Sequence, residues 1–122
     1  MKRLILLTIF YLASISAHAS EITGMFSSFK VGVSGDLSGI EIHIVPEPTG
    51  YSAIVQGSEG SPGFPEVMKI TRKDNNIIFT VPNNSGSGLA PGKWEGKVLN
   101  KELRLTRPYH IYVLPRKHSF WH

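Results

Sequence analysis

The sequence contains no cysteine. Disulfide bonds therefore cannot stabilise the fold, and a lipoprotein-type anchor, which is attached through an N-terminal cysteine, is excluded. Stability must come from a hydrophobic core, and a domain of about 100 residues is long enough to bury one. We therefore expect a single domain without a linker.

Recognisable catalytic and cofactor motifs are also missing. No serine stands in a Gly-x-Ser-x-Gly pattern, and no glycine-rich stretch continues into the Gly-Lys-Ser/Thr of a phosphate-binding loop. Among the histidines after residue 19, only His118 and His122 are close in sequence, which is too few for a zinc site. The sequence thus predicts a protein that is not an enzyme and has no metal or other cofactor.

The first 19 residues have the three parts of a secretory signal peptide. Lys2 and Arg3 form a positive start, residues 4–15 are almost entirely apolar, and residues 17–19 are Ala-His-Ala, which suits cleavage. The apolar run is shorter than the roughly 20 residues of a membrane span, so no stable membrane anchor is expected after cleavage. We expect a signal peptide at 1–19 and a mature domain at 20–122, located in the periplasm or secreted.

Basic charge is concentrated near the C-terminus. Residues 20–92 hold four basic and seven acidic residues, whereas residues 93–122 hold seven basic and two acidic ones. Such a field can attract an anionic partner. We favour a solvated face, because these charges alternate with apolar residues as strand patterning requires. Nucleic acid is not expected as a partner of an exported protein.

Short stretches with period-two alternation dominate the chain after the signal. Ile40, Ile42 and Ile44 alternate with Glu41 and His43, as in a half-buried strand. Glycine, asparagine and proline, which favour turns over strand interiors, separate the stretches. The other predicted strands are 29–34, 51–56, 67–72, 77–81, 93–99, 102–106 and 109–114. Eight short strands predict an all-β antiparallel meander, and no window has a convincing helical period.

A sheet of this kind must close or fold over, because a flat sheet would expose an apolar face and two edges. We expect the meander to close into a small barrel, with a two-layer β-sandwich as the alternative. The predicted core consists of apolar residues on one side of each strand: Ile40, Ile42, Ile44, Ile77, Phe79, Val81, Trp94, Val98, Leu103, Leu105, Ile111 and Val113. These side chains would fill most of an eight-stranded barrel, so any ligand cavity should be small.

Three irregular stretches are candidate contact sites. Residues 57–65 cannot extend a strand and could form an exposed loop that carries Phe64, and residues 83–88 suggest a flexible connection. For both stretches we favour plain connectivity over a binding role. The C-terminal residues 116–122 mix cations with aromatics, and Arg116 and Trp121 are of types enriched at binding hot spots. We favour the alternative that Phe120 or Trp121 folds back and plugs the barrel end, because exposed aromatics are costly.

Two neighbouring segments carry a resemblance to a known group of domains. Segment 92–98 has a Gly-x-Trp-x-Gly pattern centred on Trp94, and a Leu-x-Leu pattern follows at 103–105. Together with the strands at 51–56 and 77–81, this order resembles that of small exported bacterial β-barrel domains of lipocalin-like, or calycin-like, appearance. The resemblance covers most of the mature chain. It implies a barrel and offers no catalytic residues to transfer.

These observations favour binding over catalysis. We expect an exported, non-catalytic binding module whose partner is a small apolar ligand in the barrel mouth or another extracytoplasmic protein. The candidate binding residues are Phe64, Trp94, Arg116 and Trp121.

Two alternatives remain open on the sequence. An inhibitor or immunity-type protein would insert the loop 57–65 into the cleft of an enzyme. A small hydrolase would need a histidine and a carboxylate within hydrogen-bonding reach in a concave pocket. The candidates for such a pair are His43 or His110 with Glu41, Glu95 or Glu102.

Overall fold

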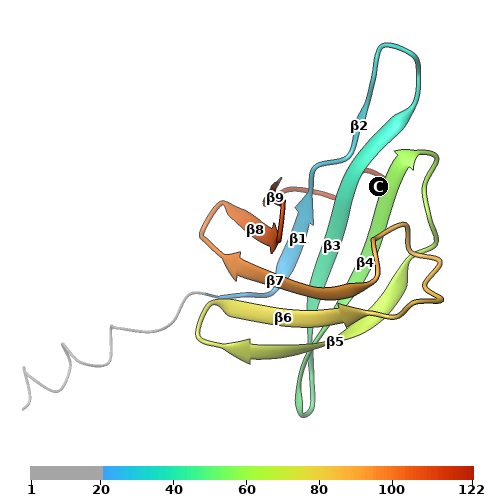
Figure 1. Ribbon diagram of the computed structural model, residues 1–122. Helices are drawn as coiled ribbons and strands as arrows, with labels where there is room; N and C mark the ends of the chain where they lie inside the picture. The colour runs from blue at the N-terminus through green and yellow to red at the C-terminus, as the bar shows by residue number, and fades with distance from the viewer. Residues whose placement is uncertain (1–20) are drawn as a thin grey trace, which may run out of the picture.

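The computed structural model describes residues 21–122, and the predicted signal peptide at 1–19 lies outside them. Nine strands form one antiparallel sheet (Figure 1). They are β1 (Gly24–Ser27), β2 (Lys30–Val31), β3 (Leu37–Glu47), β4 (Gly50–Gly60), β5 (Glu66–Lys73), β6 (Asn76–Val81), β7 (Gly92–Val98), β8 (Glu102–Arg107) and β9 (His110–Pro115). Residues 21–122 include no helix long and apolar enough to cross a membrane.

The sheet is a meander in which sequence neighbours pair from β3 to β9. β1 and β2 both pair with β3, so they act as one strand interrupted at Ser28 and Phe29. Gly39 faces this interruption with a φ of 124°, and a Cβ atom there would lie 2.5 Å from the carbonyl oxygen of Ser28. A side chain at this position would therefore be strained and would collide with the backbone. The interrupted strand and β3–β9 make the expected total of eight.

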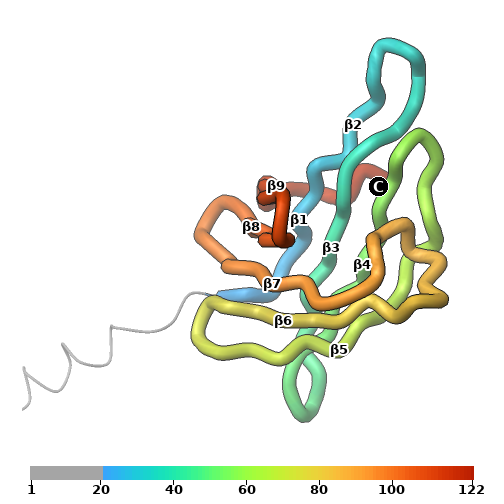
Figure 2. The backbone as a smooth tube through the Cα atoms, viewed as in Figure 1, coloured from blue at the N-terminus to red at the C-terminus, as the bar shows by residue number. Residues whose placement is uncertain are grey.

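The sheet closes where the first strand meets the segment after the last. Phe26 forms an isolated antiparallel bridge with Arg116, and the Lys117 amide donates to the Met25 carbonyl at 3.1 Å. The tube in Figure 2 shows β1 lying beside the red C-terminal part of the chain. The result is a nearly closed barrel, which confirms the predicted all-β meander and barrel over the two-layer sandwich.

The core lies inside this barrel and follows the predicted alternation in most strands. Ile77, Phe79 and Val81 of β6 are buried while the residues between them are exposed. The prediction for β9 was wrong. Ile111 and Val113 are 60% and 47% exposed, and Leu114 is fully buried instead. Both faces of β9 carry apolar residues, so alternation in the sequence did not reveal which face points inward.

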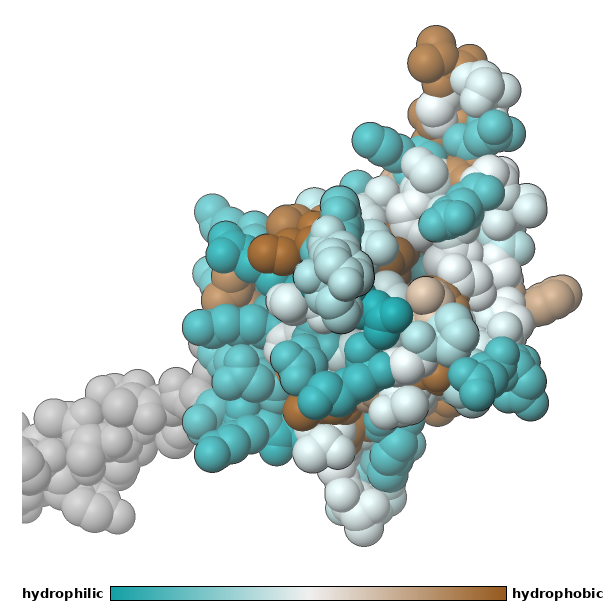
Figure 3. All heavy atoms as spheres, viewed as in Figure 1, coloured by the Kyte–Doolittle hydropathy of each residue, from teal (hydrophilic) through white to brown (hydrophobic). Residues whose placement is uncertain are grey.

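Two strand boundaries also differ from the predictions. The strand predicted at 29–34 reduces to β2, and the chain beyond it turns back as a hairpin whose tip carries the fully exposed Val33. Apolar atoms are visible at this tip in the space-filling view (Figure 3). In the other direction, β4 continues through residues 57–60, which were predicted to lie in a loop. β1 was not predicted at all.

Candidate functional site

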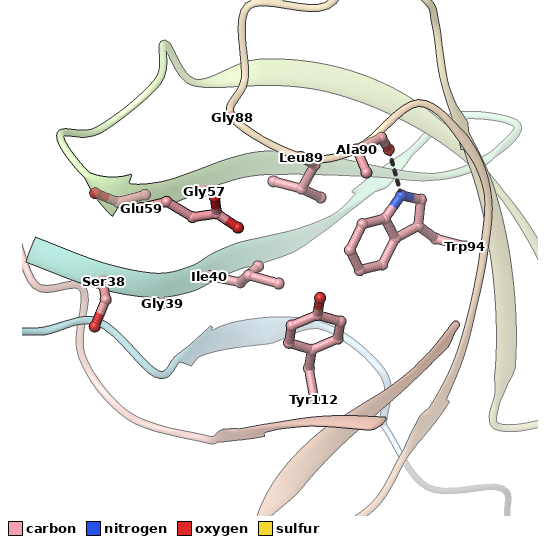
Figure 4. Close-up of a pocket in the computed structure, with 11 residues that line it drawn as sticks. Ser38, Gly39, Ile40, Gly57, Glu59, Gly88, Leu89, Ala90, Trp94 and Tyr112 are labelled. Carbon is pink, nitrogen blue, oxygen red and sulfur yellow. Dashed lines mark hydrogen bonds between the residues drawn. The ribbon is translucent and has the colours of Figure 1, made fainter. Parts of the chain in front are cut away.

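A pocket of about 220 Å³ opens at the mouth of the barrel. Ile40, Leu89, Trp94 and Tyr112 form its apolar wall, and Figure 4 shows their side chains converging on one space. The other lining residues are Ser38, Gly39, Gly57, Ser58, Glu59, Gly88 and Ala90. The pocket therefore combines this apolar wall with a few polar groups, which is the usual composition of a site for a small molecule.

Trp94 is held in place from several directions. Its side chain is 2% exposed, and its indole Nε1–H donates to the Ala90 carbonyl at 2.9 Å. The ring stacks on Phe79, lies 5.5 Å from the Tyr112 ring, and carries the Arg107 guanidinium 4.7 Å from its centroid. Because the indole N–H already has an acceptor and the ring is held by its neighbours, the part of the indole that faces the pocket is a rigid apolar surface.

The second wall of the pocket is a loop, residues 82–91, that lies against β4. The Gly57 amide donates to the Ser87 carbonyl at 2.7 Å, and the Phe64 amide donates to the Gly86 carbonyl at 2.8 Å. Glycine is required at this contact, because a Cβ atom on Gly88 would lie 2.4 Å from the Gly57 oxygen. The stretch 83–88, which the sequence suggested is a flexible connection, is thus fixed by backbone hydrogen bonds.

Glu66 fastens the same loop from β5. Its carboxylate accepts hydrogen bonds from the Ser85 hydroxyl at 2.7 Å and from the Gly86 amide at 2.9 Å. These two bonds, the Ser85 bond first, hold the pKa of Glu66 below its ordinary value. Hydrogen bonds to the ionised form favour that form, so the carboxylate stabilises the loop while it is charged.

This arrangement predicts a pH-dependent loop. The pKa of Glu66 is lower in the folded state than in the unfolded state. The stability that its hydrogen bonds give to the folded state is therefore complete above the pKa of the unfolded state, and it is lost as the pH falls through the pKa of the folded state. The Gly86 amide resonance should therefore shift as the pH is lowered from about 6 to about 3. In Glu66→Gln this step should disappear. A Gly86 resonance that titrates identically in both proteins would contradict the role of Glu66.

The four residues predicted as binding candidates do not come together. Trp94 alone lines the mouth pocket. Phe64 is 78% exposed on the loop 61–65, outside the pocket. Arg116 lies at the barrel closure, where its guanidinium donates to the carbonyls of Thr23 and Asn100 at 2.7 and 2.9 Å.

Trp121 lies on the outer wall of the barrel. Its indole N–H donates to the Gln56 side-chain oxygen at 2.8 Å, and its ring packs edge-on against Phe29. The neighbouring Ser119 hydroxyl and Phe120 amide donate to the buried carboxylate of Glu41. The tail does fold back, but the predicted plug was wrong. Glu41 and Gln56 face outward from β3 and β4, so the tail covers the outer wall instead of the barrel end.

The residues proposed for a hydrolase are not paired as that chemistry requires. Glu41 and His43 border the same shallow outer hollow, but the Glu41 oxygens are used by the tail. Glu95 pairs with Lys93, and Glu102 pairs with Arg104. Within residues 21–122, no hydrogen bond joins a histidine to a carboxylate, and no group of three potential ligands could hold a metal ion.

Comparisons of the chain with protein-family models, curated proteins and solved structures find no match. The fold and the mouth pocket are therefore the basis for any statement about function. The lipocalin-like identity implied by the resemblance stays a prediction.

Proposed function

We propose that this protein is an exported binding module that holds a small, mainly apolar molecule in the mouth of its barrel. The observation that supports the proposal is the wall formed by Ile40, Leu89, Trp94 and Tyr112, which leaves a space of about 220 Å³ beside the core. A dry cavity of about 150 Å³ accommodates benzene, so this pocket suits a ligand of roughly ten non-hydrogen atoms. Burial of such a ligand is driven by removal of apolar surface from water.

The first test uses 2-phenylethanol as a neutral probe of suitable size. We expect saturable binding in calorimetry and a shift of the Trp94 indole N–H resonance, because this group lies at the pocket wall. Ala90 is an exposed residue that lines the pocket, so Ala90→Phe should block the pocket without unfolding the protein. We expect at least about tenfold weaker binding in Ala90→Phe, which corresponds to about 1.4 kcal/mol.

Ala90→Ser is the matched control, because it changes the same position without adding bulk. It should bind the probe as the unmodified protein does. Equal binding by Ala90→Phe and Ala90→Ser would show that the ligand does not enter at the mouth. Absence of any saturable binding to the unmodified protein would refute the proposed function.

A second candidate function is binding of an extracytoplasmic protein, including the inhibitor-type alternative. It is supported by Phe64, which is 78% exposed while its backbone amide is tied to Gly86, so an apolar side chain is presented on a fixed loop. Native mass spectrometry of the protein purified from its host's extracytoplasmic fraction separates the two functions. A retained small molecule supports the pocket, and a stable protein complex that Phe64→Ala abolishes supports the loop.

A further inference from the structure

The rim of the mouth pocket carries one carboxylate that the protein itself does not neutralise. Glu59 lines the pocket, and its side chain extends along β4 towards the pocket interior (Figure 4). Within residues 21–122, the three ion pairs are Lys69 with Glu47, Lys93 with Glu95 and Arg104 with Glu102. The Glu59 carboxylate takes part in none of them, so its charge is available to a ligand.

Two residues with hydroxyl groups, Ser38 and Tyr112, also line the pocket. Ser38 of β3 pairs directly with Glu59 of β4, so their Cβ atoms lie about 5 Å apart on one face. The Tyr112 hydroxyl points into the same space from β9 (Figure 4). Carboxylate and hydroxyl oxygens all accept hydrogen bonds, and an ammonium group supplies three donors.

Along the row of paired residues that contains Glu59, the nearest cationic residue lies one strand beyond Ser38. Lys30 of β2 pairs with Ser38, so it is separated from Glu59 by two strand spacings, or about 9.6 Å. Its side chain is exposed and it does not border the pocket. Arg107, whose guanidinium lies 4.7 Å from the centre of the Trp94 ring, donates to the Lys93 and Pro91 carbonyls and does not line the pocket. Among residues 21–122, Glu59 is therefore the charged residue that lines the pocket, and Lys30 weakens its field from a distance.

We propose that the ligand class of this pocket is small amphiphilic amines, with the apolar body against Ile40, Leu89 and Trp94 and the ammonium group at Glu59. This inference rests on the proposed function and adds its charge selectivity. The apolar body lies against the apolar wall, while the ammonium group stays at the rim beside the Glu59 carboxylate. A carboxylate-bearing amphiphile of the same size would bring like charge to the rim and bind more weakly.

A matched series of three probes tests the selectivity: 2-phenylethylamine, 2-phenylethanol and phenylacetate, each titrated into the folded protein by calorimetry. A partly exposed ion pair contributes about 0.2–1 kcal/mol, so we expect the amine to bind about 1.4-fold to fivefold tighter than the alcohol at low salt. Phenylacetate should bind more weakly than the alcohol. Raising the salt to about 0.5 M should reduce these differences, because screening weakens exposed charge pairs.

Two substitutions assign the effect to the named residues. Glu59→Gln should bring the amine-to-alcohol affinity ratio close to one, because the glutamine amide carries no charge for the ammonium group to pair with. Lys30→Gln should raise the ratio, because it removes the competing positive charge. Both side chains are exposed, so neither substitution should unfold the barrel.

The outcomes separate this inference from the proposed function. Equal affinities for the amine and the alcohol, or a ratio that Glu59→Gln does not change, would overturn the amine selectivity while the binding function stands. Failure of all three probes to bind would overturn both. Tighter binding of phenylacetate than of the amine would contradict the charge argument directly.

Discussion

Arg116→Ala should lower the free energy of unfolding by about 3 kcal/mol. The guanidinium donates to the Thr23 and Asn100 carbonyls and lies 4.6 Å from the centre of the Phe26 ring. It therefore joins the first strand, the turn before β8 and the end of β9. For a domain of about 100 residues, the melting temperature should fall by roughly 15 °C.

Two comparisons show whether geometry or charge accounts for this loss. Arg116→Lys retains the positive charge but loses the planar fork that reaches several carbonyls at once, so most of the loss should remain. Arg104 pairs with Glu102 on the surface, and its side chain is 56% exposed. Arg104→Ala should change stability by no more than about 0.5 kcal/mol. Equal effects of Arg116→Ala and Arg104→Ala in urea denaturation would contradict the role of Arg116 in closing the barrel.

Gly63→Ala should destabilise the protein by about 2 kcal/mol and weaken binding of 2-phenylethanol by at least about tenfold. A Cβ atom at Gly63 would lie 2.3 Å from the carbonyl carbon of Ser87 and 2.4 Å from its oxygen. These are backbone atoms, so the loop that carries Gly88 and Leu89 must move away from β4. The pocket wall would move with it.

Gly86→Ala is a matched control in the facing loop. A Cβ atom there would meet its nearest neighbours, Glu66 and Phe64, at 3.5 and 3.6 Å, which is ordinary contact. Stability and probe affinity should stay within about 0.5 kcal/mol of the unmodified protein. If Gly63→Ala binds 2-phenylethanol as tightly as Gly86→Ala does, the loop is not a wall of the binding site.

The sequence predicted strands well where one face is polar and the other is apolar. In β3, Ile40, Ile42 and Ile44 alternate with the polar residues Glu41 and His43, and all three isoleucines are buried as expected. In β9, residues 111–114 are Ile, Tyr, Val and Leu, and no polar residue marks the outer face. Register with β8, which depends on the whole barrel, decides that Tyr112 and Leu114 point inward.

The site was harder to predict than the fold, because it is assembled by long-range pairing. Trp94 was a candidate on its own pattern, but Ser38, Glu59 and Tyr112 reach the pocket from strands distant in sequence. The glycines of the stretches 57–65 and 83–88 did contain a signal: they mark where two backbones approach closely. Such a signal identifies a contact but not its partner, so the sequence alone predicts two separate loops.

Intermolecular NOEs to bound 2-phenylethylamine would show whether a small molecule occupies the mouth of the barrel. We expect NOEs from the phenyl protons to the methyl groups of Ile40 and Leu89, which line the pocket. NOEs confined to Met25 and Ile54, which border the hollow on the outer wall, would contradict it. So would a saturated complex that shows no NOE to either pocket methyl group.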